Sequence, residues 1–143
     1  MTQIHVDLPE NLVSYVGFEL GPTDWVSITP KVVIQFAGAT RNNPKILPQG
    51  SPVPTILPVA LIGKFISELV DVGDYKLRVN YGLNNARFLT PIFKGDRIRA
   101  LISIGRVTET GSDYVEVEFN VVIEVEGKPQ PGSTVIVIYR YYK

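Results

Sequence analysis

The sequence predicts an α+β fold in which an antiparallel β-sheet wraps around one long central α-helix. Three observations support this: an apolar segment with helical spacing in mid-chain, a change to two-residue alternation after it, and short turns between the later strands. At 143 residues the chain has the length of one domain. We therefore expect residues 1–143 to form a single domain, in which residues 1–16 are an N-terminal segment.

The first predicted element is a short helix that begins near Pro30 and ends near Thr40. Proline is favoured in the first helical turn because its missing N–H would have no partner there. Residues 41–54 follow and contain four prolines, which predicts a loop. A connection of about a dozen residues often carries function, although a surface excursion without function is the alternative interpretation.

Residues 55–70 give the strongest helical pattern in the chain. The segment is apolar nearly all round, and a narrow polar stripe remains at Lys64, Ser67, Glu68 and Asp71. A helix with so little polar surface has to be covered on most of its circumference. We expect Pro58 in its first turn, where proline is tolerated.

Strands are predicted after Asp74. Residues 115–125 alternate between apolar and polar side chains, which is typical of a half-buried strand, and residues 97–107 form another. Residues 134–142 are apolar on both faces apart from Arg140, so this strand is expected in the middle of the sheet. Turn residues at 109–113 and 127–132 join the three strands into an antiparallel meander, which packs most economically around the central helix.

The composition excludes several kinds of chemistry. The chain has no cysteine, which rules out disulfides, thiolate nucleophiles and thiolate zinc sites. Its 14 basic and 14 acidic residues cancel, so no broad basic surface for nucleic acid is expected. The one histidine, His5, lies in the polar N-terminal segment. We expect no metal, no cofactor and no nucleic-acid partner.

No membrane or targeting segment is evident. Residues 1–10 lack the basic and apolar regions of a signal peptide. The longest apolar stretch, residues 56–70, is too short and too often interrupted by polar residues to span a bilayer. We therefore expect a cytoplasmic protein with no membrane partner.

Several motifs in a fixed order carry a resemblance to a known family. The longest is VNYGLNNARFLTPI at residues 79–92, followed by GDRIR at residues 95–99. GPTDW at 21–25, FAGAT at 36–40 and EGKP at 126–129 complete the set. Together they resemble the MaoC-like dehydratase family, which includes the (R)-specific enoyl-CoA hydratases. The resemblance covers nearly all of the chain from about residue 17 and implies a single hot-dog domain, in agreement with the independent prediction.

The residues of these motifs are interpreted first as structural. Gly82 and Gly95 are most simply turn residues, Pro91 limits strand pairing, and Arg87 makes structural hydrogen bonds. They identify a fold, and a fold does not by itself define a function.

The resemblance implies a catalytic aspartate and histidine within the family motif T-G-D-x-x-x-I-H. Such a pair activates a water and adds it across the double bond of an enoyl thioester, which requires groups that change protonation near neutral pH. Here Asn42 and Leu47 occupy the two positions, while Thr40 and Ile46 keep the register. Asparagine does not accept a proton from water and leucine neither orients nor deprotonates it, so we predict that the catalytic dyad is absent.

No slip in register restores the dyad, because no carboxylate or histidine lies between Asp24 and Glu68. We interpret Asp24 as a turn residue and Glu68 as part of the polar stripe of the central helix. The sequence therefore predicts no catalytic residue.

The resemblance also implies an acyl-binding site at the start of the central helix. In the family motif T-I-A-H-G a backbone N–H contacts the thioester carbonyl. This chain has TILPV at residues 55–59: Pro58 has no N–H, and Val59 keeps one at the glycine position but adds an isopropyl group. Ser67 matches a helix serine of some hydratases. The predicted substrate-binding residues are Asn42, Val59 and Ser67.

Three functions are consistent with this pattern. The first is a non-catalytic hot-dog subunit that pairs with an active homologue. The second is a stand-alone enzyme that acts on acyl-CoA thioesters with other residues, and the third is a small-molecule or acyl-thioester binding protein. An acyl-CoA thioester is the expected ligand. A homodimer, or a heteromer with a MaoC-like homologue, is the expected assembly, because the strands supply more apolar surface than one helix covers.

Overall fold

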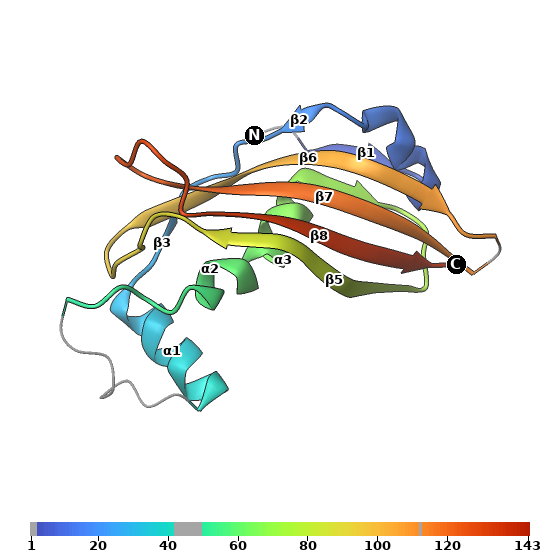
Figure 1. The fold of residues 1–143 in the computed structure, drawn as a ribbon. Coiled ribbons are helices and arrows are strands. Elements are labelled where there is room, and N and C mark those ends of the chain that lie inside the picture. Colours follow the sequence, from blue (N-terminus) through green and yellow to red (C-terminus); the bar gives the residue numbers. More distant parts are fainter. Residues whose placement is uncertain (1–2, 42–49, 112) are drawn as a thin grey trace.

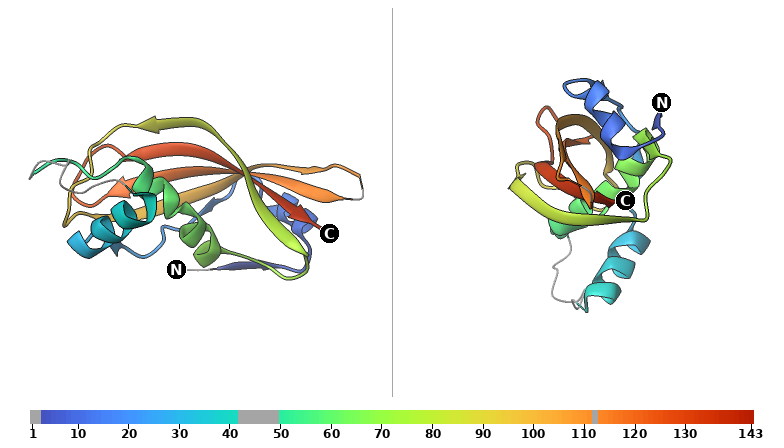
Figure 2. Two further views of the ribbon diagram at one scale, coloured as in Figure 1. Left: turned by 90° about the horizontal axis from the view of Figure 1, so that it is seen from below. Right: turned by 90° about the vertical axis from the view of Figure 1, so that its right-hand side faces the viewer.

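A long, curved antiparallel sheet wraps around a buried helical segment (Figures 1 and 2). The computed structural model describes residues 3–41, 50–111 and 113–143. The main sheet of this part of the chain contains β6 (Arg97–Glu109), β7 (Tyr114–Val125), β8 (Ser133–Tyr142) and β5 (Leu77–Phe88), adjacent in that order. Two short strands, β2 (Glu19–Leu20) and β3 (Val26–Ser27), pair with β6. The α+β class and the β6–β7–β8 meander are confirmed, as is the central position of β8.

The alternation in the sequence decides which face of each strand is buried. In β7, every second residue from Val115 to Val125 packs in the core, while acidic side chains lie on the outer face. Three of these acidic residues each face an arginine directly across the ladder. The pairs are Glu116–Arg140, Glu118–Arg106 and Glu124–Arg99, with N–O distances of 3.0, 3.6 and 2.7 Å. These partly exposed pairs favour the native register more than they add stability.

The central helix consists of two consecutive segments, α2 (Ile56–Ala60) and α3 (Ile62–Leu69), which meet at Leu61. Together they span the predicted range, and Pro58 lies in the first turn of α2 as expected. The Leu61 N–H donates to the Pro58 carbonyl at 3.1 Å, a tighter 3₁₀-type bond that marks the junction. Four α3 residues pack into the core: Ile62, Phe65, Ile66 and Leu69.

Helix α1 (Pro30–Thr40) has the predicted bounds. The Thr29 hydroxyl caps its start by accepting a hydrogen bond from the Val32 N–H at 3.2 Å. Arg41, with φ of 57°, ends the helix in the left-handed conformation. Figure 1 shows α1 projecting from the body of the sheet beyond β3.

The N-terminal segment folds onto the end of the central helix. Strand β1 (Ile4–Val6) pairs in parallel with β4 (Val70–Val72), which directly follows α3, and the 3₁₀ helix η1 (Pro9–Tyr15) packs against β6. His5 connects the two short strands, with its ring nitrogens 2.7 Å from an Asp71 oxygen and 3.2 Å from an Asp7 oxygen. Hydrogen bonds to Asp71 and then Asp7 raise the pKa of His5.

Two glycines of the family motif have different roles. Gly95, with φ of +94°, lies in the turn before β6, as predicted. The prediction of a turn at Gly82 is wrong, because Gly82 lies inside β5 and next to a register shift that follows Asn80. Glycine is common at such bulges because it relieves crowding where an extra residue interrupts the ladder.

No helix in the described part of the chain is long and apolar enough to cross a membrane.

Candidate functional site: an apolar pocket at the start of the central helix

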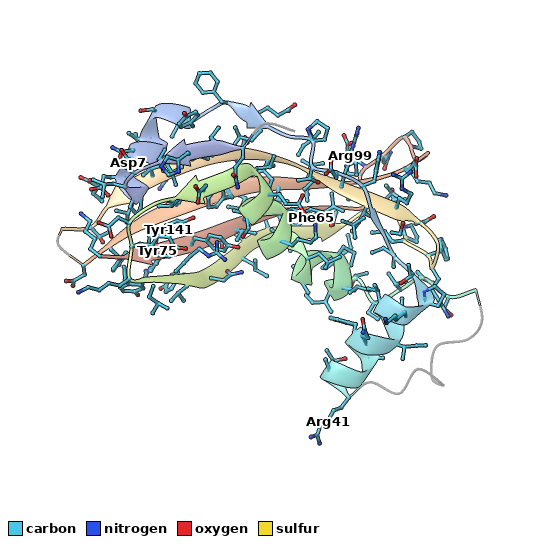
Figure 3. All side chains as sticks on the ribbon, turned by 180° about the vertical axis from the view of Figure 1, so that it is seen from behind. Asp7, Arg41, Phe65, Tyr75, Arg99 and Tyr141 are labelled. Carbon is cyan, nitrogen blue, oxygen red and sulfur yellow. The ribbon has the colours of Figure 1, made fainter. Side chains whose placement is uncertain are left out.

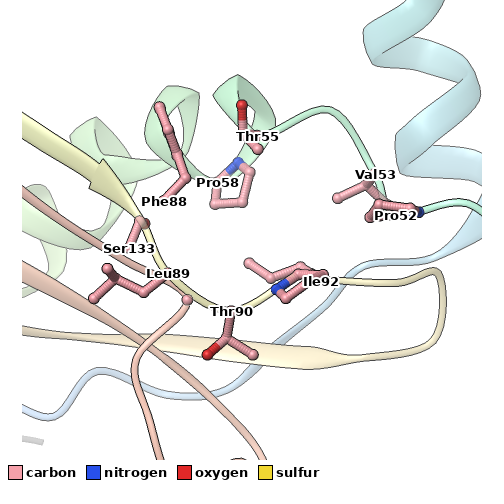
Figure 4. A pocket seen from close by; sticks show the side chains of 11 residues that line it. Pro52, Val53, Thr55, Pro58, Phe88, Leu89, Thr90, Ile92 and Ser133 are labelled. Atoms are coloured by element: carbon pink, nitrogen blue, oxygen red, sulfur yellow. The ribbon is translucent and has the colours of Figure 1, made fainter.

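A pocket of about 160 Å³ lies where the start of α2 meets the end of β5 and the start of β8 (Figure 4). This is the end of the central helix to which the sequence assigns the acyl-binding site. The described residues that line it are Pro52, Val53, Thr55, Pro58, Phe88, Leu89, Thr90, Pro91, Ile92, Gly132 and Ser133.

Backbone hydrogen bonds hold the walls of the pocket together. The Val53 N–H donates to the Ile92 carbonyl at 2.7 Å, and the Leu89 N–H donates to the Gly132 carbonyl at 2.8 Å. A Cβ atom at Gly132 would lie 2.9 Å from Val125 Cγ2 and 3.0 Å from Ile92 Cδ1. The absence of a side chain at Gly132 therefore lets Ile92 pack against the core and form one wall.

Hydroxyls are the only polar side-chain groups among the described lining residues. The Thr90 hydroxyl donates to the Gln130 carbonyl at 3.3 Å, whereas Thr55 makes no side-chain cap bond to α2. Ser133 is 2% exposed, and its Oγ has no hydrogen-bond partner in the described part of the chain. None of these lining side chains can act as a general acid or base near neutral pH. The described walls are thus suited to binding an apolar group with few polar atoms.

Of the predicted site residues, the structure describes Val59 and Ser67 and places them at separate locations. Asn42 and Leu47 lie outside the described residues. Val59 is half-buried against the core and is absent from the pocket lining, although its neighbour Pro58 lines the pocket. Ser67 lies in α3, about 12 Å further along the helix axis at 1.5 Å per residue, so the structure does not bring it together with Val59. The roles assigned to these residues stay predictions.

The first turn of α2 offers few backbone donors. The Leu57 N–H donates to the Pro54 carbonyl at 3.0 Å, and Pro58 has no N–H. With Thr55 as N-cap, Val59 is the first residue whose N–H has an acceptor within the helix. Five residues also form too short a helix for a large dipole at its end. A ligand carbonyl in the pocket therefore needs a donor from elsewhere.

A second, polar pocket of about 130 Å³ lies at the other end of the central helix. Ser67 lines it, and the Ser67 hydroxyl donates to the Gly63 carbonyl at 2.9 Å. Asp71, Arg78 and Tyr141 line it as well. Tyr141 is buried beside Tyr75 (Figure 3), with ring centres 5.2 Å apart. Burial raises the pKa of Tyr141 above the ordinary tyrosine value of 10.0, which disfavours the phenolate further.

The outer face of the sheet carries a third concavity of about 300 Å³ beside Trp25. The Arg99 guanidinium lies 4.3 Å from the centre of the Trp25 ring and also pairs with Glu124. The cation is therefore already partnered. In the described residues no group of three or more His, Asp or Glu side chains is arranged to hold a metal ion.

The sequence interpretation did not single out Ser133. The sequence feature that could have pointed to Ser133 is a hydroxyl at an inward-facing position of β8, a strand whose other inward residues are apolar or aromatic. Alternation alone predicts the inward direction but leaves open whether a hydroxyl there has a partner.

Comparison with known proteins identifies the fold and the family. No family model matches the chain. The curated 3-hydroxyacyl-thioester dehydratase Z of Mycobacterium tuberculosis is 33% identical over 141 residues, which cover 92% of this chain and 93% of the relative. The solved MaoC-like dehydratase from Rhodospirillum rubrum superposes with a TM-score of 0.67 at 13% identity, covering 90% of this chain and 92% of that chain. The C-terminally truncated HadBC (3R-hydroxyacyl-ACP dehydratase) complex from Mycobacterium tuberculosis gives a TM-score of 0.68 at 16% identity, with coverage of 88% and 96%.

A curved antiparallel sheet around a central helix, shared with these structures, defines a hot-dog protein. The similarity to 3-hydroxyacyl-thioester dehydratase Z extends over nearly the whole of both chains and narrows the assignment from the hot-dog fold to one family within it. The chain belongs to the MaoC-like hot-dog dehydratase family, as its motifs predicted.

Proposed function

We propose that this chain is an acyl-thioester-binding subunit that has no hydratase activity of its own and pairs with an active MaoC-like homologue. One observation carries the proposal: the pocket at the start of the central helix has no carboxylate or imidazole among its described lining residues. Residues 42–49 contain neither group in their sequence. Hydration of an enoyl thioester requires a proton acceptor and a proton donor, and each contributes about 10²–10⁴ in rate.

An acyl thioester is supported as ligand by the chemistry of the pocket and by the relatives. Proline, leucine, isoleucine and phenylalanine side chains form most of the lining, and a few hydroxyls are added to them. Such a pocket favours an apolar chain with one or two polar atoms. The curated relative is named a 3-hydroxyacyl-thioester dehydratase.

Pairing with a second subunit is supported by the free edge of the sheet. Strand β5 is 12 residues long and borders only β8 among the described strands. Apolar side chains along it are between 44% and 56% exposed, namely Leu77, Tyr81, Leu83 and Phe88. A long, apolar edge is usually covered, and a two-fold or pseudo-two-fold axis covers it with a like strand. The HadBC dehydratase structure is that of a complex.

The alternative of a stand-alone enzyme that uses other residues has one specific observation in its favour. Asp71 lines the second pocket and is hydrogen-bonded to His5, which gives a carboxylate–imidazole pair in that region. Both ring nitrogens of His5 are engaged by carboxylates, however, which favours the protonated imidazolium. A protonated ring with both N–H groups bonded is a poor general base. We therefore prefer the non-catalytic subunit.

The proposal is tested with the purified chain, alone and mixed with a MaoC-like homologue from the same organism that carries the Asp/His dyad. We expect the chain alone to bind butyryl-CoA in calorimetry but to leave crotonyl-CoA unhydrated, and we expect a stable complex with the homologue in sedimentation. Turnover by the chain alone at about 1–10³ per second, the usual range for enzymes, would contradict the non-catalytic role. A monomer in both samples would contradict the pairing.

A further inference from the structure

Ser133 is a buried polar residue for which the described part of the chain supplies no partner. It is the first residue of β8, opposite Phe88 of β5 and Ile123 of β7 in the ladders. Its exposed fraction is 2%, and no hydrogen-bond partner for Oγ occurs among the described residues. Buried hydroxyls are nearly always bonded, so an unpartnered one requires an explanation.

The position of Ser133 supplies that explanation, because the residue lines the pocket at the start of the central helix (Figure 4). Its partner in the ladder, Phe88, lines the same pocket, as does Pro58 on the facing helix. A ligand in this pocket would lie against the residue that has an unused hydroxyl.

Backbone donors of the pocket walls are largely in use. The N–H groups of Leu89 and Thr90 both donate to the Gly132 carbonyl, at 2.8 and 3.3 Å, and that of Val53 donates to the Ile92 carbonyl. Three further lining residues, Pro52, Pro58 and Pro91, have no N–H. The Ser133 hydroxyl is therefore a donor still available for a ligand atom that can only accept.

We propose that Ser133 is a binding residue of this pocket, whose hydroxyl donates a hydrogen bond to the thioester carbonyl of an acyl ligand. The inference rests on the proposed acyl-thioester function and names the donor that recognises the ligand. A thioester carbonyl accepts hydrogen bonds and donates none, which matches what the pocket offers. The acyl chain would contact the apolar lining, and Ser133 would replace the helix N–H that Pro58 lacks.

The test compares two ligands that differ only in the carbonyl. Butyryl-CoA carries it, and S-butyl-CoA, the thioether, does not. We expect wild-type protein to bind butyryl-CoA more tightly, and Ser133→Ala to weaken butyryl-CoA binding about five- to tenfold, the usual size for one hydrogen bond. Binding of S-butyl-CoA is expected to stay the same. Only butyryl-CoA has the carbonyl. The difference between the losses of affinity for the two ligands therefore measures the hydrogen bond itself and is free of any general effect of the substitution on the pocket.

Thr90→Val is the matched control, because Thr90 lines the same pocket but its hydroxyl is already bonded to Gln130. We expect this variant to change the affinities for both ligands to the same extent, so that the discrimination between butyryl-CoA and S-butyl-CoA stays that of the wild type. Ser133→Cys, with a similar size and a weaker donor, is expected to give an intermediate loss and serves as a second variant should alanine reduce the yield of folded protein.

The outcomes distinguish failure of the role of Ser133 from failure of the acyl-thioester function. Unchanged discrimination between the two ligands in both Ser133 variants would overturn the role of Ser133 and leave the acyl-thioester function standing. Failure of the wild type to bind butyryl-CoA, alone and in complex with the homologue, would overturn the acyl-thioester function and this inference together. A lower unfolding temperature for Ser133→Ala would show that the hydroxyl has a partner within the protein and would also overturn the inference.

Discussion

At the scale of single residues, the packing at Gly132 decides the shape of the pocket. A Cβ atom there would lie 2.9 Å from Val125 Cγ2 and 3.0 Å from Ile92 Cδ1, closer than non-bonded carbon atoms normally pack. We expect Gly132→Ala to lower the free energy of unfolding by about 1–3 kcal/mol, the usual cost of overpacking, and to narrow the pocket by displacing Ile92. Urea denaturation followed by circular dichroism measures the change.

A matched glycine provides the control for that experiment. Gly38 lies inside α1, and an added Cβ there would meet nothing within 4 Å. Gly38→Ala is expected to raise the free energy of unfolding by about 0.5–1 kcal/mol, since alanine loses less backbone entropy in a helix. Equal effects of the two substitutions would show that close packing at Gly132 is not what requires glycine there.

The predicted absence of the catalytic dyad leads to a second prediction at this scale. Asn42→Asp together with Leu47→His is expected to give detectable hydration of crotonyl-CoA, because both a proton acceptor and an imidazole are needed. The rate is expected to stay well below that of a natural enzyme, since Pro58 still withholds an N–H. Adding Val59→Gly should raise it further by opening space for the thioester carbonyl. Initial rates of the wild type, the double and the triple variant provide the measurement.

The single-substitution variants Asn42→Asp and Leu47→His are the controls, and each is expected to be inactive. A double and a triple variant that fold and bind butyryl-CoA but stay at the uncatalysed rate would contradict the prediction. That result would shift the preference from a degenerate hydratase subunit to a binding protein.

Residues differ in how well the sequence predicts their role. The replacement of the dyad by Asn42 and Leu47 is a prediction from the motif alone. It rests on residue type and stays a prediction, because both residues lie outside the described part of the chain. Ser133 could not be found in that way. A serine at the start of a strand is common, and what distinguishes this one is its burial without a partner among the described residues.

At the scale of elements, strands with regular alternation were predicted well and the irregular strand was missed. β7 and β8 follow the two-residue period, and β6 follows it from Arg97 to Ile104, before its register shift at Gly105. Their bounds and order are therefore evident from the sequence. β5 contains register shifts after Asn80 and after Asn84, and Asn85 has φ of 51°. Each shift changes which side chains face inward, so the strand shows no continuous alternation. The parallel β1–β4 pair was missed because three-residue strands are too short to show a period.

The link between β1 and β4 leads to a prediction about pH. His5 is hydrogen-bonded to Asp71 and Asp7, which raises its pKa in the folded protein. The stabilisation is therefore fully present below the ordinary histidine pKa of 6.5 and is lost as the pH rises through the raised value. We expect the N-terminal strand to detach more readily at alkaline pH, and His5→Gln to remove this dependence.

Amide hydrogen exchange of residues 4–6, corrected for the intrinsic effect of pH, measures the detachment. Protection in the wild type is expected to fall between neutral and alkaline pH, while protection of the β7 core remains constant. Asp7→Asn, which removes the negative charge of the more distant carboxylate, is expected to give a smaller loss than Asp71→Asn. Wild-type protection of β1 that is independent of pH would contradict the proposed link.

At the scale of the whole molecule, the sheet has one covered side and one open edge. The concave face is filled by α2 and α3, and the N-terminal segment closes one end of the helix (Figure 2). Beside the long edge strand β5, the described chain has no further strand to continue the ladder. Backbone groups on that edge and the apolar side chains along it thus favour addition of a strand from another subunit.

A charge introduced on this edge tests the assembly. Leu83 of β5 is 44% exposed, and Val13 of η1, outside the sheet, is 58% exposed. Since both side chains are already exposed in the monomer, replacing either with lysine should change the free energy of unfolding of the isolated chain by no more than about 0.5 kcal/mol.

In a paired sheet Leu83→Lys would bury a charge close to the two-fold or pseudo-two-fold axis, whereas Val13→Lys would not. We therefore expect Leu83→Lys to weaken self-association, or association with the homologue, by at least about tenfold, which corresponds to about 1.4 kcal/mol. Sedimentation equilibrium at micromolar concentration measures both variants. Equal association of the two lysine variants would place the subunit interface away from β5.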